Sequence, residues 1–316
     1  MRPTPSPSEA LAHAPVIVGT GLIGTSVGLA LRRRGISAYL SDTDVANAEL
    51  AASSGAGHRT PPPDRPDVVV VAVPPDQLGA TIGGALRQWP AATVTDVGSV
   101  KVSPLRNASA TGSDLTRYVG GHPLAGSERS GPAGASAALF DGRPWAVVPH
   151  DGSTPAATAV VEHLVRTCGA YVVRLGAVEH DAAVARTSHL PYLLSVLAAS
   201  GLAAFSPALA LAGPGLRDTT RVAASDPALW SQILLHNAQP LAAALSEVRG
   251  SVDEVLEILA QASPAGTAAT GDDPRLAEAA GALGELLSRG RTCAVAIRAA
   301  TDARVEAAQQ PAAGGP

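Results

Sequence analysis

Cysteine is scarce in this sequence, and the two that occur stand alone. Cys168 and Cys293 lie far apart in the chain, and neither belongs to a pair with metal-ligand spacing. A disulfide framework is therefore not expected, and we expect no metal site.

Long uninterrupted apolar runs are also missing. The first fourteen residues are rich in proline and serine and lack the apolar stretch of a signal peptide. Farther along, every apolar segment of membrane-spanning length is interrupted by glycine, proline, arginine or histidine. We expect a cytoplasmic protein with a flexible tail at 1–14 and no membrane partner.

Strong charge of either sign is absent as well. The 316 residues carry a formal net charge of −4, with 46% hydrophobic and 16% charged residues. Such a balance is typical of a globular protein and gives no indication of a nucleic-acid or anionic-membrane partner. The length is sufficient for two domains with cores of their own.

Lysine is nearly missing. Of the 23 lysine and arginine residues, only Lys101 is a lysine. One interpretation is that Lys101 marks a position needing a compact point charge rather than a planar guanidinium. The other is chance survival against a background that favours arginine, and the sequence leaves both open.

The first clear pattern is a dinucleotide-binding unit. A strand is predicted at Val16–Gly19, then the glycine run GTGLIG at 19–24, a helix to about Arg34, and a second strand at Ile36–Ser41 ending in Asp42. The complete strand–turn–helix–strand context distinguishes this fingerprint from an isolated G-x-G-x-x-G, although a tight turn without a ligand is the alternative.

The tight turn and a bound dinucleotide together explain the residue types in this unit. Gly19 permits the tight turn, Gly21 lets a pyrophosphate approach the backbone, and Gly24 lets helix and strand pack closely. A carboxylate at Asp42 accepts from a ribose 2′-hydroxyl and repels a 2′-phosphate, which favours NAD over NADP. The predicted cofactor-binding residues are Gly19, Thr20, Gly21, Leu22, Ile23, Gly24, Asp42, Val73 and Pro74.

Strands and helices then alternate. Further strands are predicted at Val68–Val73, Thr93–Val97, Tyr118–Gly120, Trp145–Val148 and Ala170–Arg174, with helices at Gln77–Gln88 and Pro155–Thr167 between them. We expect an α/β Rossmann-type doubly wound sheet at 15–176, in which ligands sit at the carboxyl ends of the strands.

The strand signal stops after residue 177. Helices are predicted at Glu179–Phe205, Pro214–Ala224, Pro227–His236, Pro240–Gln261 and Pro274–Arg289. The segment Leu193–Phe205 is apolar on more than one side, which favours a homodimer, although a tightly packed monomeric bundle is the alternative. We expect an all-α substrate and dimerisation domain at 177–305 and a disordered tail at 306–316.

A glycine-rich stretch, GGHPLAGSERSG, covers Gly120–Gly131 and carries His122, Ser127 and Glu128. Glycines let a backbone and a small ligand approach each other while a few polar groups converge on that ligand. We therefore interpret the stretch as a loop that forms the floor of an active site.

With these residues in view, the chain resembles the prephenate/arogenate dehydrogenase family of tyrosine biosynthesis over roughly residues 16–291. The resemblance rests on several motifs in the same order: TDVGSVK at 95–101, GGHPLAGSERSG, His180-Asp181, SHLP at 188–191, RDTTR at 217–221, SDP at 225–227 and Trp230. It implies an NAD-dependent oxidative decarboxylation that turns a cyclohexadienol ring into an aromatic one.

The resemblance also implies roles for single residues. His122 would accept a hydrogen bond from the C4 hydroxyl of the substrate, with Ser99 assisting at the same group, and Arg221 would bind a substrate carboxylate. The remaining matched positions line the substrate pocket or gate access to it: Ser127, His189 and Trp230 for the pocket, Glu128 and Asp218 for the gate. An ordinary alternative exists for several of them, namely a helix cap for Ser99, a core group for His189, and a solvated surface role for Arg221, Glu128 and Asp218.

Three alternatives bear on the function. Prephenate, arogenate and 4-amino-4-deoxyprephenate are not distinguished by the sequence. A β-hydroxyacid or 6-phosphogluconate-type dehydrogenase needs a lysine in the long helix after the nucleotide-binding domain, and no lysine follows Lys101. A dinucleotide sensor without chemistry would have no use for His122, Ser99 and Arg221 together. Pro214 departs from the family by altering a segment that is usually more glycine-rich, and we expect no C-terminal regulatory ACT domain of the kind that some relatives carry.

Overall fold

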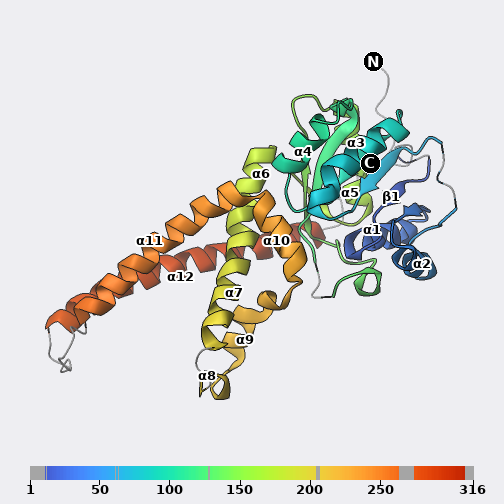
Figure 1. Ribbon diagram of the computed structural model, residues 1–316. Helices are drawn as coiled ribbons and strands as arrows, with labels where there is room; N and C mark the ends of the chain where they lie inside the picture. The colour runs from blue at the N-terminus through green and yellow to red at the C-terminus, as the bar shows by residue number, and fades with distance from the viewer. Residues whose placement is uncertain are drawn as a thin grey trace, which may run out of the picture. The chain divides into compact units, whose positions relative to one another are not determined.

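The computed structural model describes residues 11, 13–60, 62, 64–126, 129–203, 207–262 and 274–309 (Figure 1). Two compact units make up the chain, Met1–Leu241 and Ala242–Pro316. The predicted tails lie largely outside the described residues, although the last helix continues to Gln309, into the predicted C-terminal tail. The predicted domain boundary at 176/177 stays a prediction.

A mixed sheet forms the centre of the first unit. Its seven strands, within the described residues, run in the order β2-β1-β3-β4-β5-β6-β7. All neighbouring pairs are parallel except β5 and β6. The bounds are β1 Val16–Val18, β2 Tyr39–Ser41, β3 Val68–Val71, β4 Thr93–Asp96, β5 Tyr118–Pro123, β6 Pro144–Val148 and β7 Tyr171–Arg174. The predicted Rossmann-type sheet followed by a helical region is confirmed.

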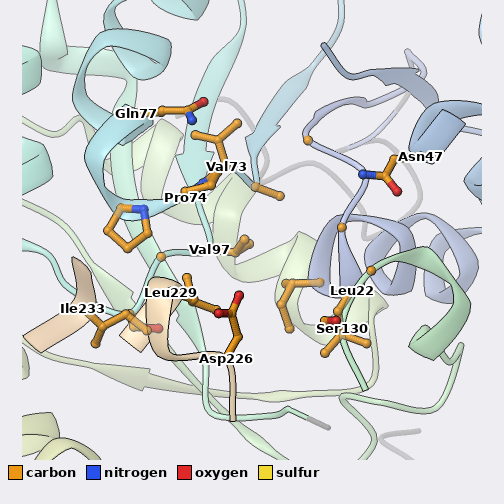
Figure 2. Close-up of a pocket in the computed structure, with 18 of the residues that line it drawn as sticks. Leu22, Asn47, Val73, Pro74, Gln77, Val97, Ser130, Asp226, Leu229 and Ile233 are labelled. Atoms are coloured by element: carbon orange, nitrogen blue, oxygen red, sulfur yellow. The ribbon is translucent and has the colours of Figure 1, made fainter. Parts of the chain in front are cut away.

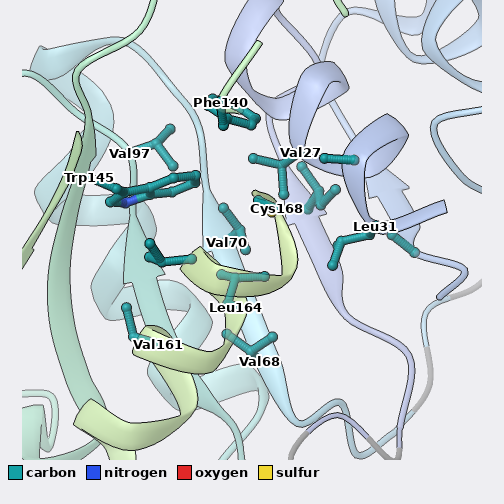
Figure 3. Packing of buried hydrophobic residues seen from close by; sticks show 14 of the residues in the cluster. Val27, Leu31, Val68, Val70, Val97, Phe140, Trp145, Val161, Leu164 and Cys168 are labelled. Atoms are coloured by element: carbon teal, nitrogen blue, oxygen red, sulfur yellow. The ribbon is translucent and has the colours of Figure 1, made fainter. Parts of the chain in front are cut away.

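Helices cover both faces of this sheet, and β3 shows why its sequence is wholly apolar. Val68 and Val70 belong to one buried cluster, whereas Val69 and Val71 belong to another, because successive side chains alternate between the faces. The first cluster includes Trp145, which packs beside Phe140 and near Cys168 (Figure 3). The helices are α1 Leu22–Arg33, α2 Val45–Ser53, α3 Pro75–Gln88, α4 Val102–Ser109 and α5 Pro155–Thr167.

The strand order also places the ligand site. The chain passes from β1 to β2 on one side and then crosses back to β3 on the other side of β1. In such sheets the crevice at the carboxyl ends of the two central strands is the binding position. Here those ends are Val18 and Val71, which are paired in register.

The helical region differs from its prediction first at its start. The single predicted helix Glu179–Phe205 is wrong, because α6 Ala177–Val184 and α7 Leu190–Ala203 are joined by a π-helical turn at Ala185–His189. A π turn inserts one extra residue into a helix, a change that apolar periodicity does not reveal and that occurs often at functional sites. Phe205 itself lies outside the described residues.

The other helices largely follow the prediction. They are α8 Pro207–Ala210, α9 Pro214–Thr220 with a 3-10 turn at Arg221–Ala224, α10 Pro227–His236, α11 Ala238–Ala262 and α12 Pro274–Gln309. The last helix extends well beyond the predicted Arg289, because alanine and arginine, both strong helix formers, dominate its continuation. Within the second unit, Arg289 of α12 forms an exposed ion pair with Glu254 of α11. Nowhere in the described chain is there a helix with both the length and the apolar character to cross a membrane.

Candidate active site

A pocket of about 520 Å³ opens at the carboxyl ends of the parallel strands (Figure 2). Segments that follow β1, β2, β3 and β4 form one side of it, and the start of α10 contributes to its wall as well. The predicted residues on its wall are Gly19, Gly21, Leu22, Ile23, Asp42, Val73, Pro74, Ser99 and Trp230. The fold therefore brings the predicted cofactor segment and two predicted substrate residues to one cavity.

The three fingerprint glycines differ in the atoms that surround them. A Cβ on Gly19, which has φ of +97°, would lie 2.2 Å from the carbonyl oxygen of Ala72, so glycine is required where β1 and β3 end. A Cβ on Gly24 would lie 2.0 Å from the carbonyl oxygen of Gly19. At Gly21 a Cβ would meet nothing described within 4 Å, although the residue lines the pocket.

This open space fits a bound dinucleotide. Gly21 is the N-cap of α1. Because glycine has no side chain, the N-cap does not bond to the first N–H groups of the helix. The free N–H groups and the helix dipole at such an N-terminus attract an anion. A glycine that faces the pocket lets a pyrophosphate approach these groups, so the residues present suit the cofactor.

Asp42 is held in a fixed orientation at the cofactor end of the pocket. Its Oδ2 accepts hydrogen bonds from the backbone N–H and the hydroxyl of Thr20 at 2.6 and 2.7 Å, and its Oδ1 accepts from the Asp44 N–H at 2.8 Å. Thr20 itself is fully buried and absent from the pocket wall. Its role in the structure is thus to orient Asp42 from behind.

Helix α10 forms a wall that the sequence revealed only in part. Asp226, Leu229 and Ile233 line the pocket from the first turns of this helix (Figure 2). Trp230, which was predicted, stacks on Tyr192 of α7 with the ring centroids 3.7 Å apart. The sequence pointed to this wall through the SDP motif at 225–227 and Trp230, but it gave no role to Asp226, Leu229 or Ile233.

His122 lies in a strand rather than in a loop. The predicted loop is wrong at its start, because the strand predicted at Tyr118–Gly120 continues to Pro123 as β5 and pairs with β6. The physical reason is close packing: a Cβ on Gly121 would lie 2.6 Å from the carbonyl oxygen of Asp96. His122 is 8% exposed and is not on the pocket wall, although it and Ser99 both come at the carboxyl ends of adjacent strands.

A second histidine contacts His122 from the helical half. The Nδ1 of His122 lies 2.9 Å from the Nε2 of His180 on α6, and the His180 Nδ1 lies 2.8 Å from the Oδ1 of Asp181. The carboxylate of Asp181 also accepts from the N–H groups of Lys101 and Val102 at the start of α4. The sequence contained His180-Asp181 as a motif but gave no role to either residue.

Beneath His122 lies a buried ion pair. The Lys101 ammonium pairs with the carboxylate of Asp96 and donates to the carbonyl of Gly121, and both charged residues are almost fully buried. Asp96 also accepts from the hydroxyl of Tyr118 at 2.9 Å. Burial, and then the charge of Asp96, raise the pKa of Tyr118 well above its ordinary value, so that hydroxyl stays a donor.

Burial keeps the two predicted histidines neutral. Desolvation lowers the pKa of His122 well below its ordinary value, with smaller contributions from the charges of His180 and Lys101. Desolvation also lowers the pKa of His189 to about 4. Neutral imidazoles can each accept one hydrogen bond and donate another.

The tautomer of His189 follows from its partner. The Nδ2 of Asn237 donates to the backbone carbonyl of Asp181 at 2.8 Å, which fixes the orientation of the amide. The same Nδ2 lies 3.0 Å from the Nδ1 of His189, which must therefore be the acceptor. The proton of His189 sits on Nε2, so this ring presents a neutral donor.

Not every predicted residue reaches the pocket. Arg221 and Asp218 are exposed and absent from its wall, and His189 is buried beside the Trp230 ring. Ser127 and Glu128 lie outside the described residues. The roles predicted for these five residues stay predictions.

Comparison with known proteins gives the same assignment across both halves. The chain matches the family model "prephenate dehydrogenase, nucleotide-binding domain" at residues 27–174 and "prephenate dehydrogenase, dimerization domain" at 176–270. It is 40% identical to the probable prephenate dehydrogenase NovF of Streptomyces niveus over 277 residues, which are 87% of this chain and 75% of that protein.

This chain belongs to the prephenate dehydrogenase family. Among solved members, the prephenate dehydrogenase of A. aeolicus in complex with hydroxyphenyl propionate and NAD+ has a TM-score of 0.77 at 25% identity, covering 92% of this chain and 100% of that one. The arogenate dehydrogenase of Synechocystis has a TM-score of 0.67 at 27% identity, covering 78% and 92%. The predicted resemblance is thereby confirmed, and the protein is a dehydrogenase of this family.

Proposed function

We propose that this protein is a prephenate dehydrogenase that couples NAD reduction to the oxidative decarboxylation of prephenate to 4-hydroxyphenylpyruvate. The observation that carries this proposal is the single pocket that has Asp42 on its wall together with Ser99 and Trp230. A dinucleotide bound across the crevice at the ends of β1 and β3 would reach from Asp42 to the end of β4. The predicted substrate residue Ser99 follows that strand.

NAD supplies the chemistry of hydride acceptance when it is bound. The chain's own contribution to holding it would come from the α1 N-terminus for the pyrophosphate and from Asp42 for the adenosine ribose. Val73, Pro74 and Val97 offer apolar contact along the pocket (Figure 2). The relative in complex with NAD+ supports the same cofactor for this chain.

The substrate side needs an acceptor at the ring hydroxyl and a cation for a carboxylate. His122, neutral because it is buried, would accept the hydrogen bond of the C4 hydroxyl as the hydride departs. Ser99 would hold the same hydroxyl from the pocket wall, and Arg221 would bind a carboxylate as an exposed guanidinium at the start of its 3-10 turn. Aromatisation supplies the driving force, so orientation and polarisation are the main tasks of these residues.

Arogenate and 4-amino-4-deoxyprephenate are the alternative substrates. They differ from prephenate in a side-chain amine or a ring amine, and an arogenate dehydrogenase is among the similar structures. Asp226, an acid on the pocket wall, is a group that an amine would favour. Its Oδ1 accepts from the Ala228 N–H as the cap of α10, and the parallel assay of the three substrates decides whether the carboxylate also binds an amine.

We propose a homodimer formed through the helical region. Leu197 of α7 is 55% exposed and Leu235 of α10 is 75% exposed, and a second copy packed against the helical region would bury them. The match to a dimerization-domain model supports this assembly. Light scattering after gel filtration would show twice the mass of one chain, and a monomer at micromolar concentration would contradict it.

The test of the function is NADH formation by the purified protein with NAD and each of the three substrates in parallel. We expect the highest kcat/KM on prephenate, with a phenolic product and release of CO2. A higher value on either amine substrate would reassign the enzyme to that substrate. If NAD binds and none of the three reacts, the protein would be a dinucleotide sensor instead.

A further inference from the structure

Three buried side chains form a continuous line of hydrogen bonds that ends at His122. Asp181, His180 and His122 are 2%, 1% and 8% exposed. The line runs from the Asp181 carboxylate through both ring nitrogens of His180 to the Nδ1 of His122, with distances of 2.8 and 2.9 Å. The proposed function uses only its last member.

The anchored end decides the direction of these bonds. Both carboxylate oxygens of Asp181 accept backbone N–H groups from the start of α4, at 2.8 and 2.9 Å. A carboxylate in this setting is an acceptor only, so the nearby Nδ1 of His180 must donate. A neutral His180 then has a bare Nε2, which accepts from the Nδ1–H of His122. It follows that the Nε2 of His122 is the unprotonated nitrogen and the one left for a substrate.

The surroundings make His122 a poor place to leave a positive charge. The ring is buried, and His180, Lys101 and His189 all further disfavour its protonated form. Asp96 neutralises Lys101 but is bonded to that lysine, to Tyr118 and to the backbone of Gly121 rather than to either histidine. His180, by contrast, lies directly against a carboxylate.

We propose that His180, oriented by Asp181, is a positioning and proton-holding residue for His122. It fixes the tautomer that offers Nε2 to the substrate hydroxyl, and it holds the proton that His122 gives up from Nδ1 while the reaction is under way. The proton-holding role rests on the proposed function, because it requires the substrate. The assigned tautomer of His122 rests only on the hydrogen bonds.

The proton movements of this proposal balance the reaction. A bound NAD would take up the hydride from C4, and the hydroxyl proton would move to His122 Nε2 as the C4–O bond gains carbonyl character. The Nδ1 proton passes to His180 Nε2. When the ring carboxylate leaves as CO2, its bonding electrons complete the aromatic ring, and both protons return, leaving a phenol. The overall reaction releases no proton, so the proton needs a nearby place from which it comes back.

Two substitutions of the same residue separate positioning from proton holding. The amide oxygen in His180→Gln can still accept from the His122 Nδ1–H but cannot take its proton, whereas His180→Leu offers no acceptor. We expect kcat to fall about tenfold or more in His180→Gln, with KM nearly unchanged, and about a hundredfold or more in His180→Leu. The solvent deuterium effect on kcat should differ between wild type and His180→Gln. His163→Gln, at a histidine of α5 bonded to Thr167, is the matched control.

A second readout needs no substrate. In protein labelled with ¹⁵N-histidine, the His122 signal, assigned by its loss in His122→Asn, should report protonated Nδ1 and bare Nε2, and His180→Leu should abolish this preference. A protonated Nε2 in the wild type, or His180 variants that match His163→Gln in kcat and isotope effect, would overturn the proposal. If the wild type shows the expected tautomer but turns over none of the three substrates, the proposed function fails while the assigned tautomer stands.

Discussion

The Nζ of Lys101 donates a hydrogen bond to the backbone carbonyl of Gly121 at 2.7 Å, directly before His122. The same ammonium pairs with Asp96 at the end of β4. One buried cation therefore links β4 to β5 next to His122, the predicted catalytic residue. The Cδ of Lys101 also lies 3.1 Å from the position that a Cβ on Gly120 would occupy. The space around this side chain is therefore filled on the side of β5.

Lys101→Arg should be harmful, because a guanidinium is larger and planar and cannot fit where a single point charge meets a carboxylate and a carbonyl. Overpacking and misplaced donors should cost about 1–3 kcal/mol of unfolding free energy and reduce kcat through the displaced His122 strand. Urea unfolding and steady-state kinetics measure both effects. Arg87→Lys, on the partly exposed α3 surface, is the conservative control. Wild-type stability and turnover in Lys101→Arg would contradict a specific need for lysine and favour the interpretation that Lys101 survived by chance.

Asp42 should set the preference for NAD. In Asp42→Ser the hydroxyl can still accept from Thr20 but no longer repels a 2′-phosphate, so the ratio of kcat/KM for NAD over NADP should fall about tenfold or more. Asp253→Ser on the exposed face of α11 is the control. An unchanged ratio would remove Asp42 from this role.

Acid should destabilise the protein partly through His189. In the unfolded chain this histidine takes up a proton below its ordinary pKa near 6.5, whereas the folded protein holds the pKa at about 4. The stabilisation is complete above pH 6.5 and is lost as the pH falls toward 4, on the order of 3 kcal/mol. His189→Gln should reduce the loss of unfolding free energy between pH 7.5 and 5, and an equal loss in both proteins would contradict this origin.

The two thiols should react differently. Cys168 is fully buried in the core, and burial raises its pKa to about 12, so it forms little thiolate at neutral pH. Cys293 is exposed on α12, and both cysteines are free. Ellman's reagent should therefore label at most one thiol in the native protein and two in denaturant. Two rapid thiols under native conditions would show that the core around Trp145 is open.

Local patterns predicted the cofactor side of the site well. The glycine run, the all-valine strand β3 and Asp42 carry their meaning within a few tens of residues, because turn geometry and strand burial depend on near neighbours in the sequence. The doubly wound sheet followed from the alternation of strands with helices. These features placed the pocket at the correct edge of the sheet.

Long-range contacts could not be predicted in this way. The His122–His180 hydrogen bond joins residues 58 positions apart, and α10 lines the same pocket as Gly19, about two hundred positions away in the sequence. Strand β5 was predicted to end at Gly120, and Gly121 was predicted in a loop where glycine would let a small ligand approach the backbone. Here the tight approach of Asp96 and Lys101 requires glycine, and tertiary packing decides the backbone conformation.

The measurement that tests the central claim most directly is the turnover of His122→Asn on prephenate, with the dissociation constant of NAD measured by fluorescence titration. Asparagine keeps a donor near the Nδ1 position facing His180 but has no acceptor in place of Nε2. We predict that kcat falls by about 10²–10⁴ while NAD binding changes less than about threefold, and that His163→Gln behaves as wild type. A His122→Asn protein with near-wild-type kcat would contradict the assignment of His122 and the mechanism built on it.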